Sequence, residues 1–576
     1  MAKHNYHGRL LFLLIVIFLL GGGVLSRLFF LQVLQYDQWS AAAKGQQQFY
    51  QTLFPKRGEI MMQDLSVARR EGKEEYYPLA ANKEFQQVYL IPKDILEEEK
   101  ENLAKQLSEL LELDEAIILQ RMNKPNDPYE PLKNKVDGEL TEKIRMLNAK
   151  GIGFAPEVWR YYPNGSLASH LIGFVGGEDR SGQYGLESYY DSELSGQAGF
   201  LAGGKDTSGH LIPTLSQKFE SSEDGTQLIL TIDQNIQFAA EKELNFLIDK
   251  LQAESGTIII MEPTTGSIWA MANWPSFDPN EYNKVEDINV FLNPAIQKVY
   301  EPGSIFKPLT IAGGLEYGKI TPLTTYQDMG EIHFGGSVIK NFDGKVRGEQ
   351  TMTQVLEKSL NTGAVFAQRA LGEELFRTFV ERLKLNEPTG IDVGGEVGGN
   401  VANLYSGREI NLATISFGQG VTVTPLGMVT ALASAANQGN MMKPFLVQKI
   451  IKADGTVIKT KPQVRGRVMS SETAEDLTKM MVSVTDIGYD KLGGVEGYAV
   501  ASKTGTAQMV DPATGGYSEE NTIHSFAGFA PAFNPQFFIL IKIDKPQGVL
   551  FASNSIAPSF GKLAKYMFNY LEIPPQ

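Results

Sequence analysis

The chain has 576 residues, of which 42% are hydrophobic, with a formal net charge of −14 and a pI near 5.2. This length exceeds what one hydrophobic core organises, so two or more domains are expected, and the acidic balance argues against nucleic acid as the main partner. The sequence has no cysteine, no metal-ligand spacing among its six histidines and no phosphate-binding glycine loop, so we expect no disulfide, metal or cofactor.

An apolar segment near the N-terminus predicts a membrane anchor. Residues 10–26 carry no charged side chain, and the apolar character continues to residue 31. The length lies at the lower end for a spanning helix. Basic residues before the segment favour a cytoplasmic tail (1–9) and an extracytoplasmic remainder, anchored once in the plasma membrane. A cleaved signal peptide is the alternative, but no A-x-A-like site follows.

Four further segments have readable patterns. Residues 35–55 are expected to be helical, and leucines at helical spacing predict one or two amphipathic helices over 94–123. Residues 201–226 are rich in Gly, Ser, Thr and Asp, which is typical of a domain boundary. Residues 535–544 are expected to contain a buried strand.

Three short strings suggest nucleophilic catalysis without histidine: Ser304-Ile-Phe-Lys307, Ser359-Leu-Asn361 and Lys503-Thr-Gly505. Pro302 and Gly303 precede Ser304 and an apolar run follows, which predicts a helix that begins at or near the serine. Lys307 then lies one turn on, within reach of the serine oxygen. The helix N-terminus favours an oxyanion at Ser304 and a neutral Lys307 that acts as base. When this string is taken alone, a surface helix start with an exposed lysine is the more frequent explanation.

The second string lies in a segment whose apolar spacing predicts a helix interrupted near Asn361-Thr362-Gly363. Ser359 and Asn361 are two residues apart, so a bend would direct both side chains into one cleft. Ser359 would relay a proton between the lysine and the leaving group, and Asn361 would donate a hydrogen bond to a peptide substrate. Helix-end capping is the alternative for this string.

The third string lies in the segment YAVASKTGTAQ, whose small and β-branched residues predict a strand. Gly505 has no side chain, so a substrate backbone would be able to approach the strand closely. Lys503 and the hydroxyls of Thr504 and Thr506 would hold a terminal carboxylate. The N–H groups of Thr506 and Ser304 would form an oxyanion hole. A polar edge strand is the alternative.

The context of the strings resembles the class B penicillin-binding proteins, the peptidoglycan D,D-transpeptidases. YEPGSIFKPLT around Ser304 is similar to their active-serine region, and SKTGTAQ around Lys503 to their third motif. Segments similar to other parts of the family lie at residues 160–176, 185–199, 230–244, 256–280, 416–428 and 524–531. One string departs from the family: Arg57-Gly58-Glu59-Ile60 is kept, but MMQDLSVA replaces the acidic-basic-glycine part that usually follows.

The resemblance implies an α+β multidomain fold. After the cytoplasmic tail (1–9) and the transmembrane anchor (10–31) we expect an elongated pedestal domain of the dimerisation type (32–220) and a penicillin-binding transpeptidase domain (221–572). The transpeptidase domain would contain an antiparallel sheet flanked by helices, with the active serine between the sheet and an all-helical lobe.

The resemblance also implies the reaction. Lys307 would take the proton of Ser304, which attacks the carbonyl of the penultimate D-alanine of a stem peptide. Ser359 and Lys503 would help pass this proton to the departing D-alanine, and an amine of a neighbouring stem would then attack the acyl-enzyme and form the crosslink. β-Lactams would acylate the same serine, and neither metal nor cofactor takes part.

Three other functions fit parts of this pattern. A β-lactamase shares the three strings but has no use for an anchor or pedestal, and no efficient deacylating base is evident. A D,D-carboxypeptidase differs only in using water as acceptor. A non-catalytic β-lactam-binding scaffold or sensor is disfavoured by the intact set Ser304, Lys307, Ser359, Asn361 and Lys503.

The expected partners follow from the resemblance. They are peptidoglycan stem peptides of the lipid-linked precursor polymer, β-lactams as inhibitors, and the membrane through the N-terminal helix. Because no glycosyltransferase domain is recognisable, a separate polytopic glycosyltransferase and other division or elongation proteins are expected. The segments NFDGKVRGEQTMTQVLEKSLN and TGIDVGGEVGG look more like the division and sporulation branch than the elongation branch.

Overall fold

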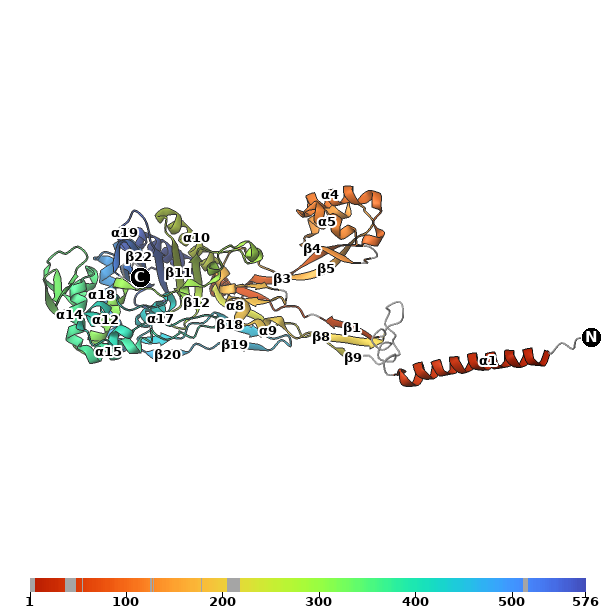
Figure 1. Ribbon diagram of the computed structural model, residues 1–576. Helices are drawn as coiled ribbons and strands as arrows, with labels where there is room; N and C mark the ends of the chain where they lie inside the picture. Colours follow the sequence, from red (N-terminus) through yellow and green to blue (C-terminus); the bar gives the residue numbers. More distant parts are fainter. Residues whose placement is uncertain are drawn as a thin grey trace, which may run out of the picture. The chain divides into compact units, whose positions relative to one another are not determined.

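The chain forms two compact units in the computed structural model (Figure 1). Residues 1–56 and 196–224 make up the N-terminal unit, and residues 57–195 and 225–576 make up the main unit. The residues that the structure describes are 6–36, 48–53, 55–124, 127, 129–177, 179–204, 218–510 and 516–575.

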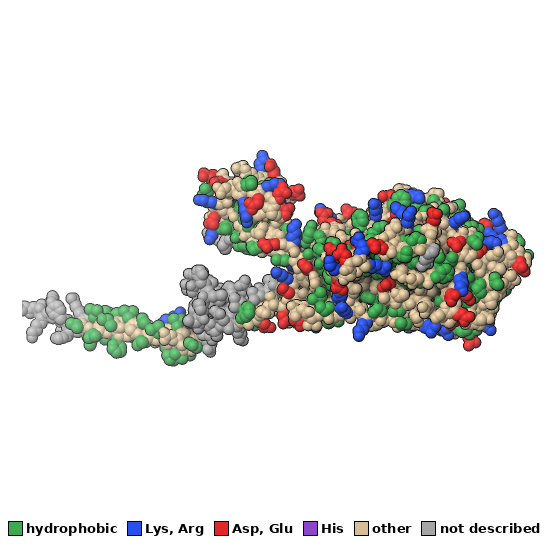
Figure 2. All heavy atoms as spheres, turned by 180° about the vertical axis from the view of Figure 1, so that it is seen from behind, with side chains coloured by type: hydrophobic (Ala, Val, Ile, Leu, Met, Phe, Trp, Pro, Cys, Tyr) green, Lys and Arg blue, Asp and Glu red, His purple; other side chains and the backbone are tan. Residues whose placement is uncertain are grey.

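The first element of the N-terminal unit is the apolar helix α1 (Tyr6–Phe29), which continues into a π-helical turn, η1 (Phe30–Leu34). Residues 10–34 have a mean hydropathy of 2.4 in their most apolar window, and none of that window is buried. Hydrophobic side chains cover this helix (Figure 2). By length and composition, α1 with η1 is able to cross a membrane, as predicted for residues 10–31.

The second element of the N-terminal unit is a three-stranded antiparallel sheet. It is formed by β1 (Gln48–Leu53), β8 (Gly199–Gly204) and β9 (Lys218–Glu220), in that order. The helix predicted over 35–55 is therefore wrong for residues 48–53, while residues 37–47 lie outside the described part. Pairing between β1 and the distant β8 decides the local conformation here, because strand hydrogen bonds outweigh weak helix propensity.

A mixed sheet of seven strands joins early and late parts of the main unit. Its spatial order is β19 (Val457–Lys459), β18 (Val447–Ile451), β10 (Gln227–Asp233), β2 (Ile60–Gln63), β3 (Tyr76–Leu90) and β4 (Glu130–Val136), with β5 (Ile152–Tyr161) also paired to β3. Only β10 and β2 are parallel. The pedestal strands therefore share one sheet with strands that lie beyond residue 220.

A small helical subdomain covers β3 and β4. Its helices are α4 (Lys100–Leu111), α5 (Glu115–Met122) and α6 (Gly138–Arg145). The first two agree with the one or two amphipathic helices predicted over 94–123, and Glu112 in the left-handed conformation separates them. Leucines of α4 and apolar residues of β3 and β4 form a separate hydrophobic core.

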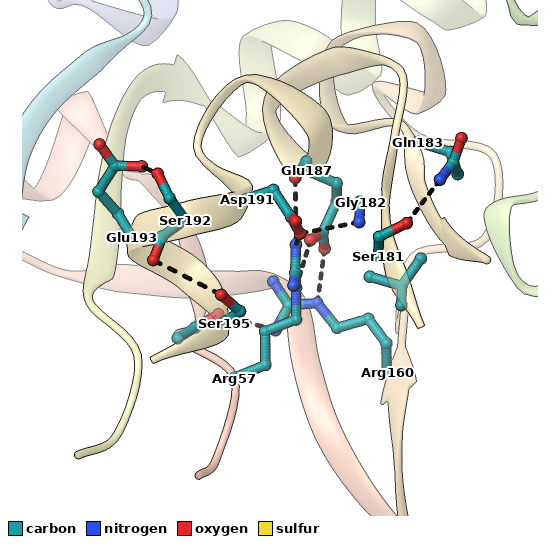
Figure 3. Close-up of polar contacts among 12 residues, drawn as sticks. Arg57, Arg160, Ser181, Gly182, Gln183, Glu187, Asp191, Ser192, Glu193 and Ser195 are labelled. Carbon is teal, nitrogen blue, oxygen red and sulfur yellow. Dashed lines mark hydrogen bonds and ion pairs between the residues drawn. The ribbon is translucent and has the colours of Figure 1, made fainter. Parts of the chain in front are cut away.

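A buried ion network ties the start of the pedestal to its later segments (Figure 3). The Glu187 carboxylate, with a fully buried side chain, accepts hydrogen bonds from Arg57 Nε at 2.7 Å and Arg160 Nε at 2.5 Å. Arg57 Nη2 also donates to Asp191 Oδ1 at 2.8 Å, and the Gly182 N–H donates to the same oxygen. The kept part of the Arg57 string thus has a structural role despite the altered residues that follow it.

A five-stranded sheet, antiparallel throughout, organises the C-terminal part. In order, its strands are β12 (Ile268–Trp274), β11 (Ser255–Met261), β23 (Phe537–Asp544), β22 (Tyr517–Ala530) and β21 (Ala501–Val510). β23 confirms the buried strand expected within 535–544. β21, which carries the third string, lies at one edge of this sheet.

Side chains of the central strands alternate between two hydrophobic cores. Ile258 and Ile260 of β11 pack with helices α10 (Gln234–Leu251) and α20 (Ala557–Tyr570), whereas Ile259 packs into the larger core on the opposite face. This alternation follows from the period of two along a strand. The sheet is thus buried on both faces, which holds its edge strand in a fixed position.

Helices gather into a lobe beside the sheet (Figure 1), and α18 (Ser471–Asp486) packs against β21. The other members are α12 (Lys307–Glu316), α13 (Met352–Glu357), α14 (Asn361–Leu371), α15 (Glu373–Arg382) and α16 (Glu409–Ile415). α17 (Pro425–Ala436) instead packs on the sheet against β11, β22 and β23. The short elements are α3 (Leu65–Glu71), α7 (Ser169–Ile172), α8 (Gly185–Tyr189), α9 (Asp191–Ser195), α11 (Pro294–Gln297), α19 (Ala552–Ser555), β6 (Phe174–Gly176), β7 (Ser181–Gln183), β13 (Thr325–Asp328), β14 (Glu331–Phe334), β15 (Ser337–Lys340), β16 (Gly348–Thr351), β17 (Asn440–Met442) and β20 (Val464–Arg467). The expected antiparallel sheet with flanking helices is confirmed, but the lobe is not all-helical, because the pairs β13–β16 and β14–β15 pack against α13 and α14.

Candidate active site

Ser304 lies where a tight turn enters a helix, as predicted. It belongs to the 3₁₀ turn η6 (Gly303–Phe306), and Lys307 is the first residue of α12, followed by Pro308 in its first turn. Gly303 has φ +58°, and a Cβ built there would lie 3.0 Å from Ala507 Cβ of β21. The turn therefore packs so closely on the edge strand that a larger residue at position 303 would push them apart.

A second set of contacts holds the serine turn from the other side. The Gly303 N–H donates to the Gly418 carbonyl at 3.0 Å, and the Gly420 N–H donates to Glu301 Oε1 at 2.8 Å. At Gly418 the φ is +80°, and a Cβ would come within 2.2 Å of the Gly303 carbonyl oxygen. The segment SFGQG, noted in the sequence only for its family resemblance, is thus a support of the serine turn.

Lys307 is completely buried and points to the second string. Its Nζ donates hydrogen bonds to the Ser359 carbonyl at 2.6 Å and to Ser359 Oγ at 3.2 Å. Burial, and then the charge of Lys503, lower the pKa of Lys307 well below its ordinary value. A neutral amine at physiological pH is what a general base requires.

The interruption of the helix in the second string comes earlier than the pattern predicts. α13 ends at Glu357, Ser359 adopts the left-handed conformation with φ +52°, and α14 already begins at Asn361. The interruption predicted near residues 361–363 is therefore confirmed, but it lies at residues 358–360, because residues 361–363 form the first turn of α14. The left-handed turn directs Ser359 toward Lys307, an uncommon conformation for a non-glycine residue and one that recurs at functional sites. Asn361 Nδ2 donates to the Lys340 carbonyl at 2.8 Å.

The third string forms the expected strand, β21. Lys503 is completely buried, and its Nζ donates to the Thr504 carbonyl at 3.0 Å. A Cβ at Gly505 would meet Ser525 Oγ at 2.6 Å and the Pro302 carbonyl oxygen at 3.0 Å. The absence of a side chain at Gly505 therefore allows the serine turn to pack closely on the strand. Thr506 Oγ1 accepts a hydrogen bond from the Ala552 N–H at 3.1 Å.

The structure adds one buried residue that the sequence did not point to. Asp490 lies between α18 and β21, is fully buried, and accepts a hydrogen bond from Thr504 Oγ1 at 2.6 Å. It precedes the third string by more than ten residues in an irregular segment, so no local pattern marks it. The three strings, together with Asp490, form one cluster in which each string touches a neighbour.

Two family models match the chain: the penicillin binding protein transpeptidase domain over residues 256–564 and the penicillin-binding protein dimerisation domain over residues 52–230. Stage V sporulation protein D of Bacillus subtilis (strain 168) is 32% identical over 577 residues, which cover 99% of this chain and 86% of that protein. The chain belongs to the class B penicillin-binding proteins.

Two further similarities agree with this assignment. A probable peptidoglycan D,D-transpeptidase PenA of Neisseria meningitidis is 29% identical over 572 residues, which cover 99% of this chain and 94% of that protein. The crystal structure of penicillin binding protein 3 from Mycobacterium tuberculosis, complexed with aztreonam, has a TM-score of 0.70 at 23% identity and covers 91% of this chain and 98% of that chain.

Membership of this family confirms the predicted class of enzyme. The protein is a serine-type D,D-transpeptidase that acts on peptidoglycan and binds β-lactams. With its apolar N-terminal helix it is a membrane-anchored member of the family.

Proposed function

We propose that Ser304 is the residue that this transpeptidase acylates with the donor stem peptide. The observation that carries the proposal is the position of Lys307, whose buried amine follows the serine by one turn and contacts Ser359. An amine that is desolvated and lies near a second lysine gives up its proton more readily. Lys307 is then able to accept the serine proton.

The first step forms the acyl-enzyme. Ser304 Oγ attacks the carbonyl of the penultimate D-alanine while its proton passes to Lys307, and the N–H groups of Ser304 and Thr506 stabilise the negative charge on the carbonyl oxygen. The tetrahedral intermediate collapses as the C–N bond breaks. Ser359, which already contacts Lys307, passes the proton to the departing D-alanine amine.

The second step transfers the acyl group to an amine. A side-chain amine of a neighbouring stem attacks the ester carbonyl, loses a proton to the same relay, and releases Ser304. Before the first step, Lys503, with the hydroxyl of Thr506, binds the terminal carboxylate of the donor through charge-assisted hydrogen bonds, and this carboxylate leaves with the D-alanine. Asn361 lies at the start of α14, in a position to orient the peptide backbone.

Labelling with a fluorescent penicillin tests the nucleophile. The full chain in detergent is incubated with the probe and digested, and the labelled peptide is sequenced by mass spectrometry. We expect the label on the peptide containing Ser304, loss of labelling in Ser304→Ala, and full labelling in the control Ser337→Ala, whose serine lies exposed on β15. Undiminished label in Ser304→Ala would exclude the assignment.

The organisation of the whole chain is proposed on the same basis. Residues 1–9 form a cytoplasmic tail, 10–31 a single membrane span, 32–220 the pedestal and 221–572 the transpeptidase domain, outside the cytoplasm. This division is supported by the apolar helix and by the two family models. A polytopic glycosyltransferase supplies the glycan. The protein acts in division or sporulation, and the similarity to stage V sporulation protein D supports this role.

A further inference from the structure

A buried carboxylate lies beneath the strand that carries the third string. Asp490 is fully buried, and its two oxygens face hydroxyl groups: Oδ1 accepts from Thr504 Oγ1 at 2.6 Å, and Oδ2 from Ser502 Oγ at 3.3 Å. Thr485 of α18 shares a hydrogen bond of 2.8 Å with Ser502. A charge in such a place is costly unless an opposite charge and hydrogen bonds compensate it.

The compensating charge is Lys503. Its Nζ lies 3.4 Å from Thr504 Oγ1, the same hydroxyl that donates to Asp490. Thr504 has a single hydroxyl hydrogen, and the hydrogen bond to Asp490 uses it, so its oxygen presents lone pairs to Lys503. The three groups therefore form a directed chain in which the lysine is the donor and the carboxylate the final acceptor.

These hydrogen bonds distinguish Lys503 from Lys307, two lysines that otherwise resemble each other. Lys307 and Lys503 are both completely buried, and burial lowers the pKa of each. Asp490 opposes this effect at Lys503, whereas the charge of Lys503 adds to it at Lys307. The charges that shift the pKa values in this cluster are those of Asp490 and Lys503. α18 contributes the Thr485 hydroxyl, and β22 carries the buried His524 opposite Thr506.

We propose that Asp490 is a positioning residue that keeps Lys503 protonated, so that Lys503 binds the substrate carboxylate while Lys307 serves as base. The inference rests on the proposed carboxylate-binding role of Lys503. It assigns to Asp490 a function in catalysis that acts through Lys503 and Thr504, without contact with the substrate. It also assigns the Thr504 hydroxyl to Asp490 as a hydrogen-bond donor. The donors left for the substrate carboxylate are then Lys503 and Thr506.

The test compares two compounds over a range of pH. Acylation rates of the full chain are measured from about pH 6 to 10 with a penicillin and with the same penicillin whose carboxylate is masked as an ester. The ratio of the two rates reports the charge on Lys503, and the masked compound alone reports Lys307. Asp490→Asn keeps the size and one acceptor oxygen but removes the charge.

We expect the rate ratio of the parent to fall at alkaline pH, where Lys503 loses its proton. In Asp490→Asn this fall should move to lower pH by about one unit or more, since an opposite charge within about 4–6 Å shifts a pKa by 1–3 units. The profile of the masked compound should move less than the ratio, because Asp490 influences Lys307 only through the charge of Lys503. Asp454→Asn, which changes an exposed aspartate in a loop, should behave as the parent.

The outcomes distinguish a failure of the role of Asp490 from a failure of the carboxylate-binding role of Lys503. An unchanged ratio profile in Asp490→Asn would overturn the inference, whatever the change in thermal stability. Equal rates of both compounds with the parent at every pH would instead disprove the carboxylate-binding role of Lys503. Should Asp490→Asn fail to fold, Asp490→Ser, which is smaller and also uncharged, must show the same shift in the ratio.

Discussion

At the scale of single residues, Lys307 and Lys503 lie in different environments, which agree with the different tasks proposed for them. Lys307 contacts the carbonyl and hydroxyl of Ser359, and no carboxylate acts on it among the described residues. Lys503 has the Asp490 carboxylate nearby, beyond one hydroxyl group. A base must be neutral when it works, whereas a cation that binds a carboxylate must stay charged.

Substitution of each lysine by alanine should therefore have different consequences. Lys503→Ala should slow acylation by a carboxylate-bearing penicillin at least tenfold, because a charge-assisted hydrogen bond contributes on the order of 2 kcal/mol. An ester-masked penicillin should react slowly with the parent and lose little more in this variant. Lys307→Ala should abolish acylation by both compounds, since Ser304 then lacks its base. Stopped-flow acylation rates measure both effects.

Lys479→Ala serves as the control, because this lysine is exposed on α18 and pairs with Glu475. Its rates should equal those of the parent. If Lys503→Ala slows the masked and unmasked compounds by the same factor, Lys503 belongs to the proton relay and its carboxylate-binding role is wrong.

At the scale of elements, the pedestal segments depend on one buried carboxylate. Glu187 of α8 joins Arg57, which precedes β2, to Arg160 of β5, so three segments far apart in the chain meet at a single side chain. Removing one partner from a buried ion network leaves the others uncompensated. The network therefore holds these three segments together.

Glu187→Gln should destabilise the protein by about 3–5 kcal/mol, the usual cost of breaking a buried ion pair on one side. Denaturant unfolding followed by tryptophan fluorescence measures the change. Glu142→Gln is the matched control, because its ion pair with Arg145 is exposed on α6 and should matter little. Equal stabilities of the two variants would contradict a structural role for the network.

The N-terminus of α10 predicts a pH dependence. Asp233 caps this helix by accepting from the Asn235 and Ile236 N–H groups, and it also accepts from the Tyr570 hydroxyl. Burial raises the pKa of Asp233 from 3.8 to about 6. Between these values the folded state binds more protons than the unfolded state, so stability falls as the pH rises from about 4 to 6.

Asp233→Asn should remove this part of the pH dependence. Relative to the variant, the parent should lose on the order of 2 kcal/mol of unfolding free energy between pH 4.5 and pH 7.5. Denaturant titrations of both proteins at the two pH values provide the measurement, and taking the difference cancels the groups they share. A parent that gains stability relative to the variant over this interval would show that Asp233 is charged throughout.

At the scale of the whole molecule, α1 decides where the enzyme works. Its side chains are mostly apolar and exposed along residues 10–34. The hydrocarbon core of a bilayer suits such a surface, because a helix bonds the backbone groups of its interior turns within itself.

The full chain should sediment with membranes and resist alkaline carbonate extraction, with residues 10–26 present in the mature protein. Leu14→Arg combined with Leu19→Arg should release it, because each arginine near the helix centre costs roughly 2.5–3.5 kcal/mol of insertion. Leu323→Arg, at an exposed site of the main unit, is the control. Soluble extracytoplasmic protein that begins after residue 26 would identify a cleaved signal peptide instead.

The sequence by itself determined the features that depend on neighbours along the chain. The apolar run of α1, the helix start at Ser304, the helices α4 and α5 and the strands β21 and β23 all follow from caps and periods of a few residues. The three strings also predicted the chemistry, because their residue types limit what a site can do.

Only the tertiary structure decided the features that depend on distant segments. β1 is a strand because β8 pairs with it, Gly505 is needed because the serine turn packs on it, and Ser359 turns left-handed where it meets Lys307. Asp490 is recognised as part of the site only because α18 and β21 lie side by side in the fold. Contacts between residues far apart in the chain leave no local period, so the sequence alone gives no sign of them.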